Sequence, residues 1–211
     1  MNTITDDAQA RQAAEYLAGA DPILAPVITR YGLCDIRPHR NYYQALVGEI
    51  IGQQLSVKAA ASIRQRFDGL FGGVFPTPEA ILGKNIEELR NVGLSRPKAS
   101  YIRDLAQHVV DGKVKFDHLD RLANEDVIAE LTDVKGIGEW TAHMFLMFCM
   151  GRTDVLAHGD LGIRNAMKKL YGLKEAPTPD KVERIAKRNH WSPYETIACW
   201  YLWASLENVP A

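Results

Sequence analysis

The chain has 211 residues, of which 46% are hydrophobic and 24% are charged, and its formal net charge is −1 at pH 7. This composition is typical of a folded globular protein and excludes a disordered chain or one coated in basic residues. The apolar run "MFLMFCM" at 144–150 is too short to span a bilayer, and the N-terminus lacks the features of a signal peptide. We therefore expect a cytoplasmic protein that does not contact a membrane.

Helical periodicity runs through the sequence, whereas strand signals are scarce. The first helix has an acidic start and alanine-rich filling, and the second has one apolar stripe. Serine, threonine and proline mark the starts of later helices. Helices are expected at 6–19, 41–54, 57–72, 77–82, 85–92, 96–111, 124–131, 139–150, 160–170, 179–188 and 193–207. The sequence therefore predicts an all-α protein with short connections.

Two segments resemble each other and predict a pair of helix–turn–helix units. "LRNVGLSRPKASYI" at 89–102 and "LTDVKGIGEWTAHM" at 131–144 each place a leucine, a valine three residues later, a glycine-bearing turn and a new helix. No low-complexity linker separates domains.

The stretch "VKGIGEWTA" at 134–142 predicts a tight turn with two glycines before a helix. Glycine tolerates positive φ and exposes bare backbone, and the N–H groups of a helix start attract phosphate. The turn can therefore hold a DNA backbone, with Lys135 adding charge. A helix–helix corner that needs Gly136 and Gly138 only for its geometry explains the stretch equally well.

Asp160 precedes the helix expected at 160–170, where a lone aspartate is most often an N-cap. The surrounding sequence makes a functional role worth considering. It contains, in this order, a glycine hairpin, an apolar helix, "DV", a loop and "DLGIR".

The chain resembles the helix-hairpin-helix DNA glycosylase superfamily, and within it the 3-methyladenine (alkylated-base) glycosylases. The resemblance covers "YQALVGEIIGQQLSVKAA", "LRNVGLSRPKASYIRDLA", "LTDVKGIGEWTAHMFL", "DLGIRNAMKKLYG" and "WSPYETIACWYLW". It implies two helical lobes with an active-site cleft, expected here as 41–154 and as 1–40 plus 155–211. It also implies an enzyme that acts on double-stranded DNA containing alkylated bases and is nucleoid-associated in a bacterium. We expect this enzyme to act as a monomer.

The resemblance implies that Asp160 is catalytic. Hydrolysis of an N-glycosidic bond builds positive charge on the sugar, which a carboxylate stabilises. Relatives that also cut the strand carry a lysine at the position of Trp140, so the expected enzyme is monofunctional, without lyase activity. The expected base pocket comprises Trp140, Met144, Trp191 and Tyr194. A core position is the alternative for Trp140, and Trp200, Tyr201 and Trp203 are expected in the core.

The resemblance also assigns DNA-contacting residues. In "GQQLS", Gln54 or Leu55 is expected to enter the base stack while Gln53 orders the loop, and a polar cap between helices is the alternative. The expected phosphate contacts are Lys135, Gly136, Ile137, Gly138 and Thr141. Backbone carbonyls of Thr132, Val134 and Gly136 would hold a structural Na⁺ or K⁺, and no other cofactor is expected.

Two positions depart from the family pattern. Ala157 stands where a proline is usual, and Glu195 stands where an arginine is common. His158 is near Asp160, but a single histidine is more often a surface or DNA-facing residue than a metal ligand. Two alternative functions remain open, a noncatalytic hairpin protein that binds damaged DNA and a glycosylase for oxidised or mismatched bases.

Overall fold

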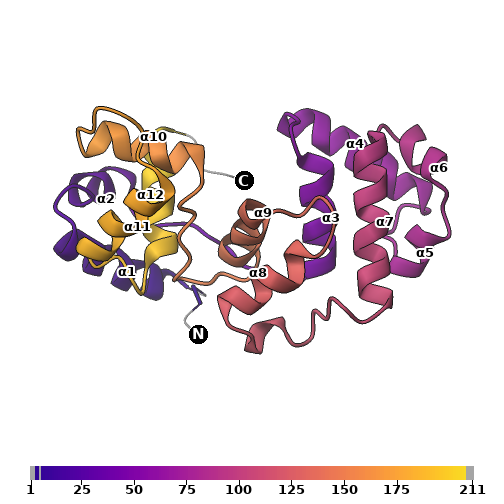
Figure 1. Ribbon diagram of the computed structural model, residues 1–211, viewed down its shortest axis with the longest axis horizontal. Helices are drawn as coiled ribbons and strands as arrows, with labels where there is room; N and C mark the ends of the chain where they lie inside the picture. Colours follow the sequence, from indigo (N-terminus) through magenta and orange to yellow (C-terminus); the bar gives the residue numbers. More distant parts are fainter. Residues whose placement is uncertain (1–2, 5, 208–211) are drawn as a thin grey trace. The chain divides into compact units, whose positions relative to one another are not determined.

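The structure is a computed structural model that describes residues 3–4 and 6–207, and within these residues it consists of helices and connecting loops (Figure 1). The α-helices are α1 (Asp7–Ala20), α2 (Ala25–Tyr31), α3 (Tyr42–Gly52), α4 (Val57–Leu70), α5 (Pro78–Leu82), α6 (Ile86–Asn91), α7 (Arg96–Val110), α8 (Asn124–Thr132), α9 (Glu139–Met144), α10 (Leu161–Leu170), α11 (Pro179–Arg188) and α12 (Glu195–Ala204). The expected all-α fold is confirmed. No helix in the described part of the chain is long and apolar enough to cross a membrane.

Two helices differ from the sequence prediction. The sequence did not predict α2, which has only seven residues, a proline in its first turn and two buried side chains, Val27 and Ile28. The helix expected over 139–150 is α-helical only to Met144 and continues as a π-helical turn, Phe145–Cys149. Most residues in this run are buried, so its hydrophobic pattern has no periodicity from which the change could be seen.

Contacts within the chain divide it into two compact units, one formed by 41–145 and the other by the described residues of 1–40 and 146–211. Residues 146–154, expected with the hairpin lobe, belong to the second unit. Backbone hydrogen bonds attach these residues to the second unit. The Ile4 N–H donates to Gly151 O at 2.8 Å, and the Thr196 N–H donates to Thr153 O at 2.9 Å. Residues 1–2, 5 and 208–211 of the expected second lobe lie outside the described residues.

The unit 41–145 is built around α7, which packs against α3, α5 and α6. Its buried face consists of Ala99, Ile102, Leu105 and Ala106, at the spacing of a single helical stripe. Ser95 caps the helix by accepting a hydrogen bond from the Lys98 N–H. This rigid helix supports the two turns that carry the candidate DNA contacts.

The other unit is centred on α12, which contacts α1, α2 and α10. Every residue from Thr196 to Ala204 is buried, as expected for a helix that is apolar on all sides. Tyr201 uses its one polar atom to donate to Gly32 O at 2.8 Å. The helix therefore fixes the position of its aromatic side chains relative to the start of α10.

Candidate active site and DNA-contacting hairpin

The turn between α8 and α9 requires glycine at one position but not at the other. Gly136 has φ +86°, and a Cβ there would overlap the ring of Tyr101 on α7. Gly138 has φ −95°, and a Cβ there would meet no atom within 4 Å. The packing of the turn therefore requires glycine at 136 but not at 138, where the backbone at the start of α9 is left uncovered.

The fold already uses some of the expected phosphate-binding groups. The Lys135 N–H donates to Oδ2 of Asp104 at 2.9 Å, and Lys135 Nζ lies 3.5 Å from Oδ1 of the same carboxylate. The Ile137 N–H donates to Val134 O at 3.1 Å. Gly138 is the N-cap of α9, no side chain caps this helix, and Thr141 is buried in its first turn. The surface that can meet a phosphate is thus the backbone around Gly138 together with the exposed ammonium of Lys135.

Two of the three carbonyls expected around a cation already accept hydrogen bonds. Val134 O accepts from the Ile137 N–H, and Gly136 O accepts from Nε2 of Gln53 at 2.8 Å. A carbonyl oxygen has a second lone pair, so these atoms together with Thr132 O can still ligate a monovalent cation. The donor set fits Na⁺ or K⁺, which prefer oxygen ligands.

The "GQQLS" segment forms a short exposed loop between α3 and α4. Gln53 ends α3 and directs its amide to the α8–α9 turn, as expected of a residue that orders the loop. Gln54 has φ +57°, and Leu55 is 40% exposed. Ser56 caps α4 by accepting a hydrogen bond from the Ala59 N–H. Both candidate stack-entering residues therefore lie at an exposed tip.

Trp140 lies in the first turn of α9 with 46% of its surface exposed. A large aromatic side chain that serves as a core residue is not left this open. Met144, one turn later, is buried. Of the two pocket residues expected on α9, Trp140 is therefore the one that is accessible from outside.

Asp160 is the N-cap of α10, and its carboxylate is held by two donors. Oδ1 accepts from the Ile163 N–H at 2.8 Å and from Nε1 of Trp203 at 2.8 Å. At Gly162, a Cβ would lie 3.0 Å from Oδ1 and 3.1 Å from the Trp203 ring. Asp160 remains half-buried rather than enclosed. The carboxylate therefore has a fixed orientation and still reaches the surface.

Trp203 is a site residue that the sequence analysis placed in the core. It is buried, its ring centre lies 5.8 Å from that of Phe148, and its indole N–H bonds the candidate catalytic carboxylate. A buried tryptophan usually needs an acceptor for its N–H, which was the available signal. The sequence could not identify that acceptor, because Asp160 and Trp203 are brought together only by the packing of α10 on α12.

Trp191 and Tyr194 lie close together, because the Tyr194 N–H donates to Trp191 O at 2.7 Å. The Trp191 indole N–H donates to Oδ2 of the fully buried Asp21 at 2.8 Å. Tyr194 makes an edge contact with Tyr16, with ring centres 5.3 Å apart. The structure thus pairs Asp160 with Trp203, which was expected in the core.

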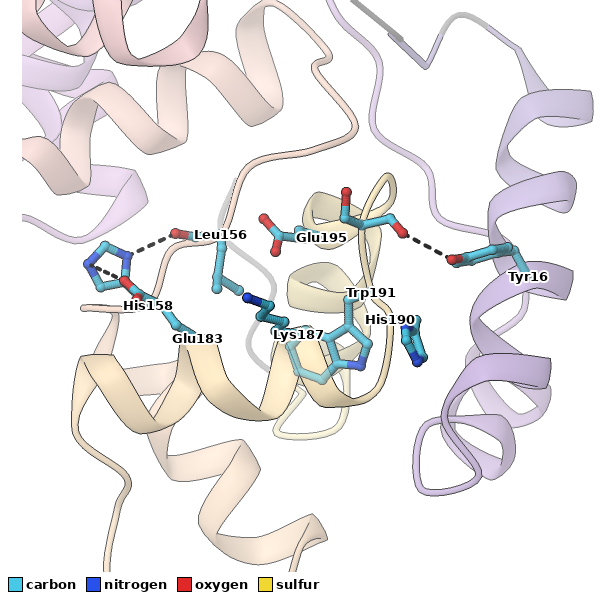
Figure 2. A pocket seen from close by; sticks show the side chains of 9 residues that line it. Tyr16, Leu156, His158, Glu183, Lys187, His190, Trp191 and Glu195 are labelled. Atoms are coloured by element: carbon cyan, nitrogen blue, oxygen red, sulfur yellow. Dashed lines mark hydrogen bonds and ion pairs between the residues drawn. The ribbon is translucent and has the colours of Figure 1, made fainter.

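Trp191 lines a cavity of about 520 Å³ within the unit that contains α12 (Figure 2). Asp160 is not among the residues that line it, which are Tyr16, Leu156, His158, Glu183, Lys187, His190, Trp191, Ser192 and Glu195. In Figure 2, His158 and Glu183 face each other on one side, and Tyr16 reaches the loop after Trp191 on the other. His158 Nε2 lies 3.7 Å from Oε1 of Glu183.

Glu195 is a strongly perturbed acid of this cavity. Burial, and after it the negative charges of Asp154 and Glu183, raise the pKa of Glu195 to about 7, while His158 acts in the opposite direction. An arginine at this position would experience attraction from the same carboxylates. At position 195 the neighbouring carboxylates would therefore stabilise a charged arginine, whereas they disfavour the charged form of the glutamate that is present.

The alanine at 157 does not leave the loop before Asp160 unsupported. Ala157 is fully buried, and its carbonyl accepts from the Asp160 N–H at 3.0 Å. Thr196 also holds the loop, because its hydroxyl accepts from the Val155 N–H at 3.2 Å and donates to Arg152 O at 2.6 Å. These bonds replace the stiffness that a proline would give.

Fold and site together define an all-α protein with a backbone-presenting hairpin and a separately fixed carboxylate at a helix start. A family model described as HhH-GPD superfamily base excision DNA repair protein matches residues 47–190. DNA-3-methyladenine glycosylase 1 of Schizosaccharomyces pombe is 35% identical over 199 residues, which cover 91% of this chain and 86% of the relative. The chain therefore belongs to the HhH-GPD superfamily of base excision DNA repair proteins.

Two solved structures agree with this assignment. The crystal structure of the DNA-3-methyladenine glycosidase of Bacillus halodurans matches with a TM-score of 0.83 at 38% identity, covering 97% of this chain and 92% of that one. The S. pombe 3-methyladenine DNA glycosylase Mag1, in complex with abasic DNA, matches with a TM-score of 0.77 at 35% identity, covering 91% and 95%. The resemblance inferred from the sequence motifs is confirmed at the level of the family.

Proposed function

We propose that this protein is a monofunctional DNA glycosylase that hydrolyses the N-glycosidic bond of 3-methyladenine and related alkylated purines in duplex DNA. The observation that carries the proposal is the half-buried carboxylate of Asp160, oriented by the Ile163 N–H and the Trp203 indole. The names of the two 3-methyladenine relatives support the substrate class.

The chemistry requires one carboxylate beside the sugar of an extruded nucleotide. The bond between C1′ and the base nitrogen breaks, and its electron pair leaves with the base. The positive charge that develops on the sugar is stabilised by Asp160, and the oxygen of a water molecule then bonds C1′ while the water loses one proton to the Asp160 carboxylate. An alkylated purine carries a positive charge that the departing electron pair neutralises, so the reaction does not need a strong general acid.

Trp140 supplies selectivity in this proposal. An exposed indole attracts a cationic, electron-poor base over its face, by roughly 0.5–2 kcal/mol. An indole cannot form a Schiff base with the sugar, so the product is an abasic site in an uncut strand.

The hairpin holds the DNA backbone in this proposal, and the protein acts as a monomer. The open backbone at Gly138 receives a phosphate, and Lys135 adds positive charge. Carbonyls of Thr132, Val134 and Gly136 would hold a Na⁺ or K⁺ ion, which contributes further positive charge next to the phosphate.

The proposal is tested by incubating the protein with methylated duplex DNA and separating the released bases by chromatography. We expect free 3-methyladenine, abasic sites that become strand breaks only after alkali treatment, and no break before it. If no base is released although the DNA is bound, the protein is a noncatalytic damage-binding protein and the proposal is wrong. Release of oxidised or mismatched bases alone would assign the enzyme to a different substrate class.

A further inference from the structure

The exposed loop at Gln54 and Leu55 is anchored from behind by a lysine on another helix. Nζ of Lys98 on α7 donates to Ile51 O at 2.9 Å and to Gln53 O at 2.5 Å. Both carbonyls belong to the C-terminal end of α3, where carbonyls have no partner within the helix. An ammonium group at this end also interacts favourably with the helix dipole. Partial burial lowers the pKa of Lys98, as expected for a charge that has exchanged water for backbone oxygens.

A second bond joins the same loop to the α8–α9 turn. The carbonyl of Gln53 accepts from Lys98, while its side-chain amide donates to Gly136 O at 2.8 Å. Gly136 is the turn residue that the ring of Tyr101 on α7 holds in place. One residue, Gln53, is thereby fixed to α7 and to the hairpin at once.

The residue that follows this double anchor has an unusual backbone. Gln54 has φ +57°, a conformation that residues with a side chain rarely adopt and that persists only where the surroundings impose it. Its side chain is exposed, and the nearby Leu55 and Val57 are 40% and 78% exposed. The bonds of Lys98 and Gln53 stand immediately before the strained position. The Leu55 N–H donates to Gly52 O at 3.0 Å and closes a turn over Gln53 and Gln54, and the bonds of Lys98 and Gln53 attach this turn to α7 and to the hairpin.

We propose that Lys98 and Gln53 are positioning residues that hold the tip at Gln54 and Leu55 in a fixed place relative to the α8–α9 hairpin. A duplex gripped at the hairpin then meets the tip at the step where a nucleotide is displaced. This inference rests on the proposed function, because the tip has a task only if the protein turns a nucleotide out of the stack. Insertion of a wedge demands positional accuracy, since a misplacement of about 1 Å costs large factors in rate.

The inference is tested by Lys98→Met, which keeps an unbranched apolar stem of nearly the same length and removes the ammonium donors. Duplex DNA carrying 2-aminopurine next to a 3-methyladenine analogue reports unstacking through its fluorescence. We expect Lys98→Met to lose most of the fluorescence rise and to lower the single-turnover excision rate by roughly ten-fold or more. The dissociation constant for DNA should change much less, because the hairpin contacts remain. Lys98→Arg, which keeps charge and donors, should recover a large part of both signals.

The matched control is Lys113→Met, which removes one exposed lysine from the same unit. Because the Lys113 side chain makes no hydrogen bond or ion pair with the loop in the described part of the chain, this variant should match the wild type. Gln53→Met removes only the bond to Gly136. It replaces Lys98→Met in the test if a thermal melt shows that Lys98→Met is not folded. It should shift fluorescence and rate in the same direction.

Wild-type fluorescence and rate in a folded Lys98→Met or Gln53→Met variant would contradict the inference. A wild-type protein that raises the fluorescence but releases no base would overturn the proposed function. The positioning role would still be supported in that case if the variants lose the fluorescence rise.

Discussion

The two glycines of the hairpin, Gly136 and Gly138, differ in what the structure requires of them. The sequence alone allowed a geometric role or a DNA-contacting role for both. The structure separates them, because Gly136 has a positive φ and contacts Tyr101, whereas Gly138 has ordinary backbone angles and open space around it. One glycine serves the fold, and the other leaves room for a partner.

This difference predicts opposite results for two alanine variants. Gly136→Ala forces a Cβ against Tyr101 at a positive φ and should destabilise the protein by about 1–3 kcal/mol. Gly138→Ala meets no atom of the protein and should leave the melting temperature within a few degrees, but it should weaken DNA binding. Thermal melts and DNA titrations measure the two effects. A stable Gly136→Ala protein, or unchanged DNA affinity in Gly138→Ala, would refute the corresponding assignment.

A second residue-scale prediction concerns the bond from Trp203 to Asp160. Trp203→Phe keeps an aromatic ring but removes the donor to Oδ1. Because a hydrogen bond to a charged group is worth about 1.5–3 kcal/mol, we expect the excision rate to fall by roughly ten-fold or more. DNA binding should stay near the wild-type value. Single-turnover kinetics at saturating enzyme measure the change, and an unaltered rate would show that the indole does not orient the carboxylate.

At the scale of elements, periodicity in the sequence was sufficient to predict most helices, because each buries one stripe or lies in an apolar core. It missed α2, which is short and has a proline in its first turn, and the π-helical turn Phe145–Cys149, whose residues are apolar. Periodicity also could not predict the contact between Asp160 and Trp203. Such a contact depends on how α10 and α12 pack, and residue spacing along one helix does not encode that packing.

The start of α12 carries a pH dependence that can be measured. Burial and the charges of Asp154 and Glu183 raise the pKa of Glu195 to about 7 from an ordinary value of 4.5. The folded state therefore binds this proton more tightly than the unfolded state does. The contribution of Glu195 to the stability of the folded state is fully present below pH 4.5 and is lost as the pH rises through 7.

Glu195→Gln cannot ionise and should lose this decline. At pH 8 the variant should be more stable than the wild type by about 1–2 kcal/mol, a value reduced for the partial exposure of the group. At pH 4.5 the two should have similar stabilities. Urea titrations at the two pH values measure the difference, and an equal offset at both would show that Glu195 is not the titrating group. Asp7→Asn, at an exposed carboxylate of α1, is the control.

At the scale of the whole molecule, the net charge of −1 did not reveal a DNA-binding protein. The order of the motifs did indicate one. The hairpin, the aspartate and the aromatic helix near the C-terminus are each weak signals alone, and their order along the chain is what carries the resemblance. The family match over residues 47–190 supports that inference. The placement of the aromatic residues was less predictable, since Trp191 bonds Asp21 and lines a cavity while Trp203 bonds Asp160. Which tryptophan reaches which carboxylate is a property of the packed unit.

The central claim is that Asp160 is the catalytic carboxylate, and Asp160→Asn tests it most directly. Asparagine is also a good N-cap, so α10 should remain intact. The matched control is Asp6→Asn, because Asp6 caps α1 in the same way by accepting from the Gln9 N–H at 2.9 Å. In single-turnover assays on DNA containing 3-methyladenine, we expect Asp160→Asn to bind the DNA but release no base above background, and Asp6→Asn to behave as the wild type. Base release by a folded Asp160→Asn protein at the wild-type rate would contradict the account.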